Sequence, residues 1–311
     1  MKTRPFKQLD VFTDTAYLGN PLAVVLDGTD LSGAEMQHFA QWTNLSETTF
    51  LLPPSAAGAA QGADYQVRIF TPGCELPFAG HPTLGSCQAW LQSGGKPQAG
   101  DFIVQECQVG LVRIRRDGTR LAFAAPALKR SVPGDAVVAE VATALGLDMA
   151  HIAAAVLLDN GPVWLGLLLQ DAACMPGLSP DHGQLRKLGL KVGVVHVEQS
   201  QNTSPLIARS NREARAFGPR ASTATLNLGG VSVQVRAFAA AAGVNEDPVT
   251  GSLNASLAQW LIAEGLAPSR YTATQGTSLG RHGQVHIEQD ASGQVWVGGD
   301  VVTCIEGSVT L

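Results

Sequence analysis

The sequence predicts an α+β fold with two pseudo-symmetric lobes, each a strand-rich, barrel-like sheet wrapped around one central helix. Three observations support this prediction. The 34 glycines and 17 prolines indicate many turns, which suit a fold of short strands. Long helical patterns near residues 81–95 and 251–264 stand among many strand-like runs. Similar segments also recur in the two halves of the chain, which indicates a duplicated unit.

The elements of the first half follow from hydrophobic periodicity and turn residues. An amphipathic helix is expected over 31–44 with Ser32 as its N-cap, and a second helix begins at His81 and ends at Gly94-Gly95. Asp117-Gly118 is typical of a hairpin turn. Apolar or alternating runs predict strands at 7–13, 20–27, 47–53, 64–72, 102–107, 110–118 and 119–126.

The pattern restarts near Pro126, so we expect a first lobe over 1–128 and a second over 129–299, with 300–311 returning to the first. The polar, arginine-rich segment 210–230 is expected to be a long mobile loop. Helices are predicted at 135–148, 180–190 and 251–264, and strands at 153–159, 162–170, 191–199, 231–239, 283–290 and 293–311.

The repeat is clearest around two similar hexapeptides. "VRIF" at 67–70 precedes "HPTLGS" at 81–86, and "VRAF" at 235–238 precedes "DPVTGS" at 247–252 after a loop two residues shorter. In this alignment His81 matches Asp247, and Gly85-Ser86 matches Gly251-Ser252. We therefore expect the hexapeptides to be equivalent helix starts that face one cleft between the lobes.

A helix start of this kind is suited to bind an anion, because its first N–H groups lack intrahelical partners. For either hexapeptide alone, capping is the better explanation, with Asp247 as a capping carboxylate and His81 as a polar residue near a helix start. Ionisable residues in both copies favour a site that grips a small carboxylate. A third candidate is Glu47 in "NLSETTFLL", where apolar neighbours would raise the pKa of its carboxyl. On local sequence alone, an exposed glutamate at a strand start is the simpler interpretation of Glu47.

Composition excludes several classes of function. The formal net charge of -5 and the pI near 5.8 argue against nucleic acid as a partner. The N-terminus has no signal-peptide pattern and no apolar run is long enough to cross a membrane, so we expect a cytoplasmic protein without membrane contact. The five cysteines have no metal-ligand spacing, and no metal is expected.

Six segments together resemble the phenazine biosynthesis PhzF-like family, which is similar in fold to diaminopimelate epimerase. They span nearly the whole chain in the family's order: "DVFTDTAYLGNPLAVV", "NLSETTFL", "RIFTPGCELPFAGHPTLGS", "NGPVW", "AAGVNEDPVTGSLNASLAQWL" and "QGTSLGRHGQVHI". The pair "ELPFAGHPTLG" and "EDPVTGS" is the most specific.

The resemblance implies a cofactor-free isomerase with its active site between the lobes. The best-known member moves a proton between carbons of a dihydro-hydroxyanthranilate. By resemblance, Glu47 is the general acid and base, and His81 and Asp247 orient and polarise the substrate. The substrate-binding residues implied around them are Ser46, Gly80, Gly251 and Ser252. A homodimer is also expected.

Four alternatives remain open at this point. A cysteine-pair epimerase is disfavoured because the positions before the helix starts hold Ala79 and Asn245, which leaves a cysteine-independent epimerase or racemase of an amino or hydroxy acid. Hydrolysis at "GTSLG" (276–280) requires a following helix, whereas the alternation there predicts a strand. A metal site at His282 and His286 is disfavoured for the same reason. A non-catalytic small-molecule-binding protein on this fold is the last alternative.

Overall fold

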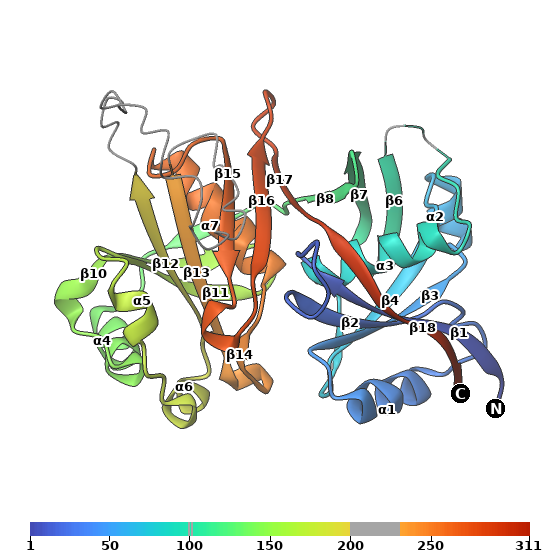
Figure 1. Cartoon of the computed structure of the whole chain (residues 1–311), viewed down its shortest axis with the longest axis horizontal. Coiled ribbons are helices and arrows are strands. Elements are labelled where there is room, and N and C mark those ends of the chain that lie inside the picture. The colour runs from blue at the N-terminus through green and yellow to red at the C-terminus, as the bar shows by residue number, and fades with distance from the viewer. Residues whose placement is uncertain (99, 101, 200–230) are drawn as a thin grey trace, which may run out of the picture.

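Two long helices, each enclosed by its own set of strands, organise the structure (Figure 1). The structure is a computed structural model that describes residues 1–98, 100, 102–199 and 231–311. The segment 210–230, predicted to be a loop, lies outside the described residues. The α+β architecture predicted from the sequence is confirmed, with one strand-wrapped helix in each half.

The first half surrounds α3 (Gly80–Gln92). Two other helices lie on its outside, α1 (Gly33–Thr43) and α2 (Ala56–Ala60). Its strands are β1 (Thr3–Val11), β2 (Asn20–Val25), β3 (Glu47–Leu52), β4 (Tyr65–Phe70), β5 (Glu75–Leu76), β6 (Phe102–Cys107), β7 (Gly110–Asp117), β8 (Arg120–Ala124) and the last strand of the chain, β18 (Val301–Thr310).

The second half surrounds α7 (Gly251–Ala263). Its other helices are α4 (Asp135–Leu145), α5 (Cys174–Gly177) and α6 (His182–Leu188), with 3₁₀ turns at Met149–His151, Ala240–Ala242 and Thr277–Leu279. Its strands are β9 (Lys129–Ser131), β10 (Ile152–Asp159), β11 (Val163–Leu169), β12 (Lys191–Gln199), β13 (Val231–Ala239), β14 (Val244–Asp247), β15 (Arg270–Gln275), β16 (Gly283–Gln289) and β17 (Val295–Gly299).

The two halves have the same strand order and the same strand directions. Neighbours in the first half run β18, β1, β2, β3, β4, β6, β7, β8, and those in the second run β9, β10, β11, β12, β13, β15, β16, β17. The third pair (β2–β3, β11–β12) and the fifth pair (β4–β6, β13–β15) are parallel, and the other pairs are antiparallel. Each strand in this order in one half therefore has a counterpart in the other.

The chain crosses between the halves at its end. After β17 pairs with β8 of the first half, the backbone passes Asp300 and continues as β18, which pairs along the whole of β1. Figure 1 shows this red strand beside the blue N-terminal strand, with both termini close together. The predicted strand 293–311 is thus two strands with different partners.

Small and apolar residues on all sides of the two central helices allow their burial. The first seven residues of α3, Gly80 to Ser86, are all buried, and α7 is buried over most of its length. One continuous apolar cluster contains residues of both helices, including Leu84 and Leu253. The burial of both helices in one core fixes their starts relative to each other.

Local capping agrees with the sequence prediction for α1. The Ser32 hydroxyl accepts a hydrogen bond from the Glu35 N–H (3.2 Å), and the Glu35 carboxylate accepts one from the Ser32 N–H (2.8 Å). Strand β15 was not predicted, because its sequence "RYTATQ" is short and half polar. Its pairing with β13 and β16 stabilises this segment as a strand, although its local sequence has little strand propensity.

The predicted alignment of the two hexapeptides is wrong. α3 begins at Gly80, so His81 is the second residue of that helix. α7 begins at Gly251, so Asp247 is the last residue of β14 and precedes its helix by four residues. His81 and Asp247 therefore do not occupy equivalent positions.

Two matching ion pairs give the correct register. Arg68 donates through Nε and Nη2 to Glu75 (2.7 and 2.6 Å), and Arg236 donates through the same atoms to Glu246 (2.9 and 2.8 Å). Each guanidinium also lies 5.1 Å from the ring centroid of the phenylalanine two residues later. "ELPFAG" at 75–80 is thus equivalent to "EDPVTG" at 246–251. The misleading match arose because Pro-x-x-Gly-Ser recurs inside α3.

Candidate active site

The starts of α3 and α7 meet where the two halves join. A Cβ added to Gly80 would lie 3.0 Å from the Gly251 Cα, and one added to Gly251 would lie 3.2 Å from the His81 nitrogen. The N-cap residues are Ala79 and Thr250, and within the described residues neither side chain caps its helix. The first N–H groups of both helices therefore converge on one place, which favours an anionic group there.

Glu47 lies at the start of β3 and faces this place from the first half. Its Oε2 is 3.5 Å from His81 Nδ1, and its side chain is 16% exposed. Burial is the main cause that raises the pKa of Glu47, and the nearby Asp247 carboxylate raises it further. Among the described residues, Oε2 has no hydrogen-bond partner. This carboxyl is therefore poised to hold a proton near neutral pH.

Asp247 faces the same place from the second half. Its Oδ1 accepts a hydrogen bond from Asn20 Nδ2 (2.8 Å), and its Oδ2 accepts one from the Thr250 hydroxyl (2.7 Å). Burial raises the pKa of Asp247, and these two hydrogen bonds partly oppose that effect. Asn20 also donates to the Val249 carbonyl (2.9 Å), so it ties the first half to the approach of α7.

His81 is buried beside the Glu47 carboxyl and the Asn20 amide. Burial lowers the pKa of its imidazole to about 3, so the ring is neutral at neutral pH. Its Nδ1 is 3.4 Å from Asn20 Nδ2, and its Nε2 has no hydrogen-bond partner in the described part of the chain. His81 can therefore exchange hydrogen bonds with a ligand but does not offer a positive charge.

A buried amide network holds the start of α7. Gln275 Nε2 donates to the Asp247 carbonyl and to the Thr250 hydroxyl (both 3.0 Å). Gln275 Oε1 accepts from the Thr250 N–H (3.1 Å) and from Asn254 Nδ2 (2.8 Å). Because the side chains of Gln275, Thr250 and Asn254 are buried, the network fixes the half-buried Asp247 against the helix start.

The predicted substrate-binding residues divide into two groups. Gly80, Gly251 and Ser252 lie at the helix starts, and Ser252 accepts hydrogen bonds through its hydroxyl from Trp164 Nε1 (3.2 Å) and through its carbonyl from Asn160 Nδ2 (3.0 Å). Ser46 directly precedes β3 and is half-buried. Within the described residues, none of the hydrogen bonds or ion pairs of the site includes Ser46, so its role stays a prediction.

Sequence reasoning missed five residues that the structure brings to the site. The sequence does mark some of them as candidates, because several are polar or cationic residues beside apolar strands, within segments that resemble the family. The residues are Asn20, Asn160, Trp164, Lys191 and Gln275.

The alternative chemistries have less support in the geometry. The corrected register pairs Ala79 with Thr250 rather than with Asn245, and neither N-cap is a cysteine. Burial raises the pKa of Cys87 to about 12, which keeps that thiol protonated. "GTSLG" forms a 3₁₀ turn followed by strand β16, and no group of three potential metal ligands occurs in the described residues.

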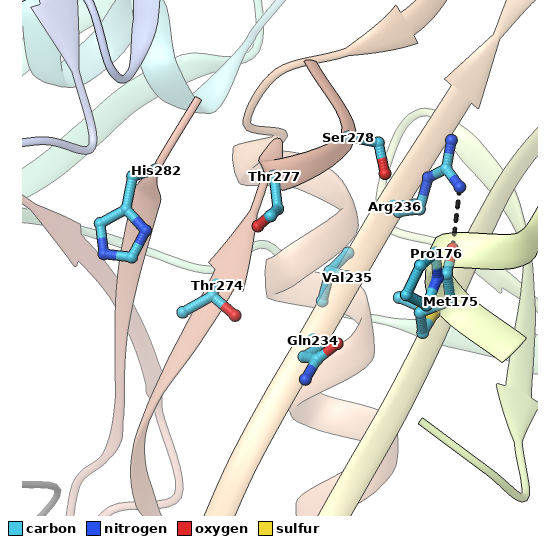
Figure 2. Close-up of a pocket in the computed structure, with 9 residues that line it drawn as sticks. All are labelled: Met175, Pro176, Gln234, Val235, Arg236, Thr274, Thr277, Ser278 and His282. Atoms are coloured by element: carbon cyan, nitrogen blue, oxygen red, sulfur yellow. Dashed lines mark hydrogen bonds between the residues drawn. The ribbon is translucent and has the colours of Figure 1, made fainter. Parts of the chain in front are cut away.

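A separate pocket of about 570 Å³ opens in the second half. Figure 2 shows its polar wall, in which Arg236 donates to the Met175 carbonyl (2.9 Å). Its lining does not include Glu47, His81 or Asp247. Because the ionisable groups with shifted pKa values converge at the junction, we assign the candidate active site to the junction.

Comparison with known proteins identifies the family. A sequence profile of the family described as "Phenazine biosynthesis-like protein" matches residues 9–307. "Antisense-enhancing sequence 1" of Schizosaccharomyces pombe is 36% identical, and the alignment covers 99% of each chain. The "Trans-2,3-dihydro-3-hydroxyanthranilate isomerase" of Pseudomonas aeruginosa is 30% identical over 97% of this chain and 98% of the relative.

A solved structure has the same fold over the full length. The phenazine biosynthesis protein of the PhzF family from Bacillus anthracis superposes with a TM-score of 0.77 at 21% identity and covers 100% of both chains. The chain belongs to the phenazine biosynthesis-like family. It is an enzyme of the isomerase and epimerase class that acts on a small molecule, as the names of its relatives indicate.

A helix that crosses a membrane needs about 20 predominantly apolar residues. None of the helices in the described residues is both long and apolar enough to cross a membrane.

Proposed function

We propose that this enzyme moves a proton on a small carboxylate substrate, with Glu47 as the general acid and base. The observation that carries the proposal is the placement of Glu47. Its carboxyl is buried, has a raised pKa, and lies beside two helix starts that approach each other closely. A single residue that takes a proton and returns it elsewhere requires such a pKa.

The neighbours of Glu47 have complementary roles in this proposal. His81 is neutral and exchanges a hydrogen bond with the substrate, and Asp247 is held by Asn20 and Thr250 so that it orients a donor group. Amides at Gly80 and Gly251, with the Ser252 hydroxyl, stabilise the negative charge that develops when the proton leaves. None of these steps needs a cofactor or a metal.

The relatives suggest which substrate to try first. One relative is named for trans-2,3-dihydro-3-hydroxyanthranilate, an unsaturated amino acid with an acidic C–H group. We propose an acid of this kind, in which a carboxylate sits near the carbon that loses the proton. A cysteine-independent epimerase of an amino or hydroxy acid is the second candidate, because removal of the same proton, followed by delivery of a proton to the opposite face of that carbon, inverts its configuration.

Incorporation of solvent deuterium tests the proposal. The protein is incubated in D₂O with trans-2,3-dihydro-3-hydroxyanthranilate and with a panel of α-amino and α-hydroxy acids, and each product is analysed by NMR and mass spectrometry. Deuterium at a carbon next to the unsaturated system or the carboxylate supports proton transfer. Binding of these acids without any exchange would support instead a non-catalytic binding protein.

We also propose a homodimer in the cytoplasm, with a lobe boundary between residues 128 and 129. Among the described strands, β9 pairs only with β10 and β18 only with β1, so their outer edges are the positions from which a second copy would extend the sheets. Sedimentation at several protein concentrations tests the dimer, and limited proteolysis near residue 128 tests the boundary.

A further inference from the structure

Lys191 occupies in the second half the position that Glu47 occupies in the first half. β3 begins at Glu47, which pairs with Leu22 of the parallel neighbour β2. β12 begins at Lys191, which pairs with Trp164 of the parallel neighbour β11. The pairing of β3 with β4 and of β12 with β13 gives the same alignment. The two halves therefore present a carboxyl and an amine to the junction from equivalent positions.

The surroundings of Lys191 place its ammonium group beside the start of α7. Nζ lies 5.8 Å from the ring centroid of Trp164, and the indole N–H of Trp164 donates to the Ser252 hydroxyl (3.2 Å). The positive charge of Lys191 acts on both carboxyls of the site, because it lowers the pKa of Glu47 and of Asp247 against the effect of burial.

This ammonium group has no carboxylate partner in the described residues, where no ion pair of 4.0 Å or less includes Lys191. Three buried polar atoms of the site also have no partner there: Glu47 Oε2, His81 Nε2 and Asn160 Oδ1. Buried polar groups are normally hydrogen-bonded, so this set indicates a missing ligand. His81 and Asn160 are only 3% and 6% exposed.

We infer that Lys191 binds the carboxylate of the substrate, on the side of the junction opposite Glu47. This inference rests on the proposed function. An anionic substrate would be repelled by Asp247, and the helix starts offer only partial positive charge. A full cation at Lys191 compensates for that repulsion and gives a charge-assisted hydrogen bond. The site should therefore prefer acids to their neutral amides.

Binding of a matched pair of probes tests the inference. Calorimetry measures the affinity of 3-hydroxyanthranilate and of 3-hydroxyanthranilamide, which differ only in the carboxylate. We expect wild-type protein to bind the acid about tenfold or more tightly than the amide, as one charge-assisted contact allows. Lys191→Met should abolish this preference, and Lys191→Arg should keep most of it. An equal ratio in wild type and Lys191→Met, or no preference in wild type, would overturn the inference.

The same variants separate this inference from the proposed function. Glu47→Gln should keep the preference for the acid while it loses deuterium exchange. If Lys191→Met loses the preference but Glu47→Gln exchanges at the wild-type rate, Lys191 binds the carboxylate and the role of Glu47 is wrong. If Glu47→Gln stops exchange while Lys191→Met keeps the wild-type preference, the proposed function stands and the inference about Lys191 fails.

Discussion

Burial acts in opposite directions on the two ionisable side chains that contact each other in the site. It raises the pKa of Glu47 and lowers that of His81, so it favours the neutral form of both. A neutral glutamic acid can donate a proton. A neutral imidazole with a low pKa can accept or donate a hydrogen bond without taking that proton. The local environment thus separates the roles of the two residues.

The raised pKa of Glu47 predicts a dependence of stability on pH. Below the pKa of an unfolded glutamate both states hold the proton, and the stabilising contribution is complete. As the pH rises from there through the higher pKa of the folded state, the unfolded chain releases its proton first and stability falls. The unfolding free energy of Glu47→Gln minus that of wild type should therefore be more than about 1 kcal/mol higher at about pH 8 than at about pH 5.

Urea unfolding of wild type and Glu47→Gln at both pH values measures this difference. Glu35→Gln on the exposed capping box provides the control, because hydrogen bonds with Ser32 lower the pKa of Glu35. The difference in unfolding free energy between Glu35→Gln and wild type should change with pH in the opposite direction or not at all. A constant difference between wild type and Glu47→Gln at the two pH values would contradict the raised pKa.

The sequence pointed to the ionisable side chains of the candidate site more readily than to the side chains that hold them. Glu47, His81 and Asp247 lie in segments whose residue types already suggest acid–base chemistry. Asn20 and Gln275 are uncharged, and they reach Asp247 from strands that are far from it in the chain. Such contacts depend on the strand order of the fold, and no local pattern contains that order.

At the scale of elements, the two Arg–Glu pairs differ in burial although they are equivalent in position. Both partners of Arg236–Glu246 are 8% exposed, whereas Arg68 and Glu75 are 30% and 22% exposed. Loss of one partner from a buried pair leaves an unpaired charge away from water. Glu246→Gln should therefore destabilise the protein by about 3 kcal/mol or more, and Glu75→Gln by about 1 kcal/mol.

Thermal and urea unfolding of these two variants provide the comparison. The two substitutions remove the same group from the same kind of pair, so each is the control for the other. Equal losses of stability would show that burial does not determine the strength of these pairs.

The close approach of α3 and α7 makes a second prediction for the elements. A Cβ at Gly80 would lie 2.7 Å from the Phe123 ring and 3.0 Å from the Gly251 Cα, so one helix start must move. Gly80→Ala should cost about 1–3 kcal/mol of stability. It should also reduce catalysis by more than its effect on folding, because the helix N–H groups would no longer converge.

Gly307→Ala is the matched control, since an added Cβ there meets no atom within 4 Å and the residue is an exposed position of β18. It should be neutral or slightly stabilising. Activity of Gly80→Ala equal to that of Gly307→Ala would contradict a role for the helix starts in the site.

The register of the repeat shows why elements are easier to predict than their equivalence. Both central helices are evident in the sequence, and both were expected near their true ends. Their alignment was not, because "HPTLGS" begins at the second residue of α3, whereas "DPVTGS" begins four residues before α7, and the two share proline, glycine and serine at the same spacing. Only the ion pairs between strands β4 and β5 and between β13 and β14 identify the equivalent residues.

At the scale of the whole molecule, the last strand ties the end of the chain to its beginning. β18 covers all of β1, and Lys7 of β1 pairs with Glu306 of β18 (2.9 Å). A chain that ends at Gly299 would lose this strand and expose the edge of β1. We expect its melting temperature to fall by about 10 °C or more, because the first half loses an entire strand.

Circular dichroism melting and gel filtration of the truncated chain test this expectation. Ile305→Thr, which alters an exposed side chain but keeps the backbone pairing, should melt close to wild type. A truncated chain with the same melting temperature as wild type would show that the stability of β1 does not depend on β18.

The overall architecture was predictable because duplication left its mark on both helices and most strands. The joint between the halves was not, because it depends on the pairing of β8 with β17 and on the crossing of the chain at Asp300 from β17 to β18. The site lies at that joint. Its residues come from the starts of β3 and β12, from the end of β14 and from both helix starts, so only the assembled fold brings them together.

The central claim is that Glu47, within this joint, transfers the proton. The most direct measurement is the rate of solvent deuterium incorporation into trans-2,3-dihydro-3-hydroxyanthranilate, or into the acid that exchanges fastest, by wild type, Glu47→Gln and the control Glu75→Gln. We predict a loss of about 10²–10⁴-fold for Glu47→Gln and a nearly wild-type rate for Glu75→Gln. Exchange by folded Glu47→Gln at the wild-type rate would contradict the claim.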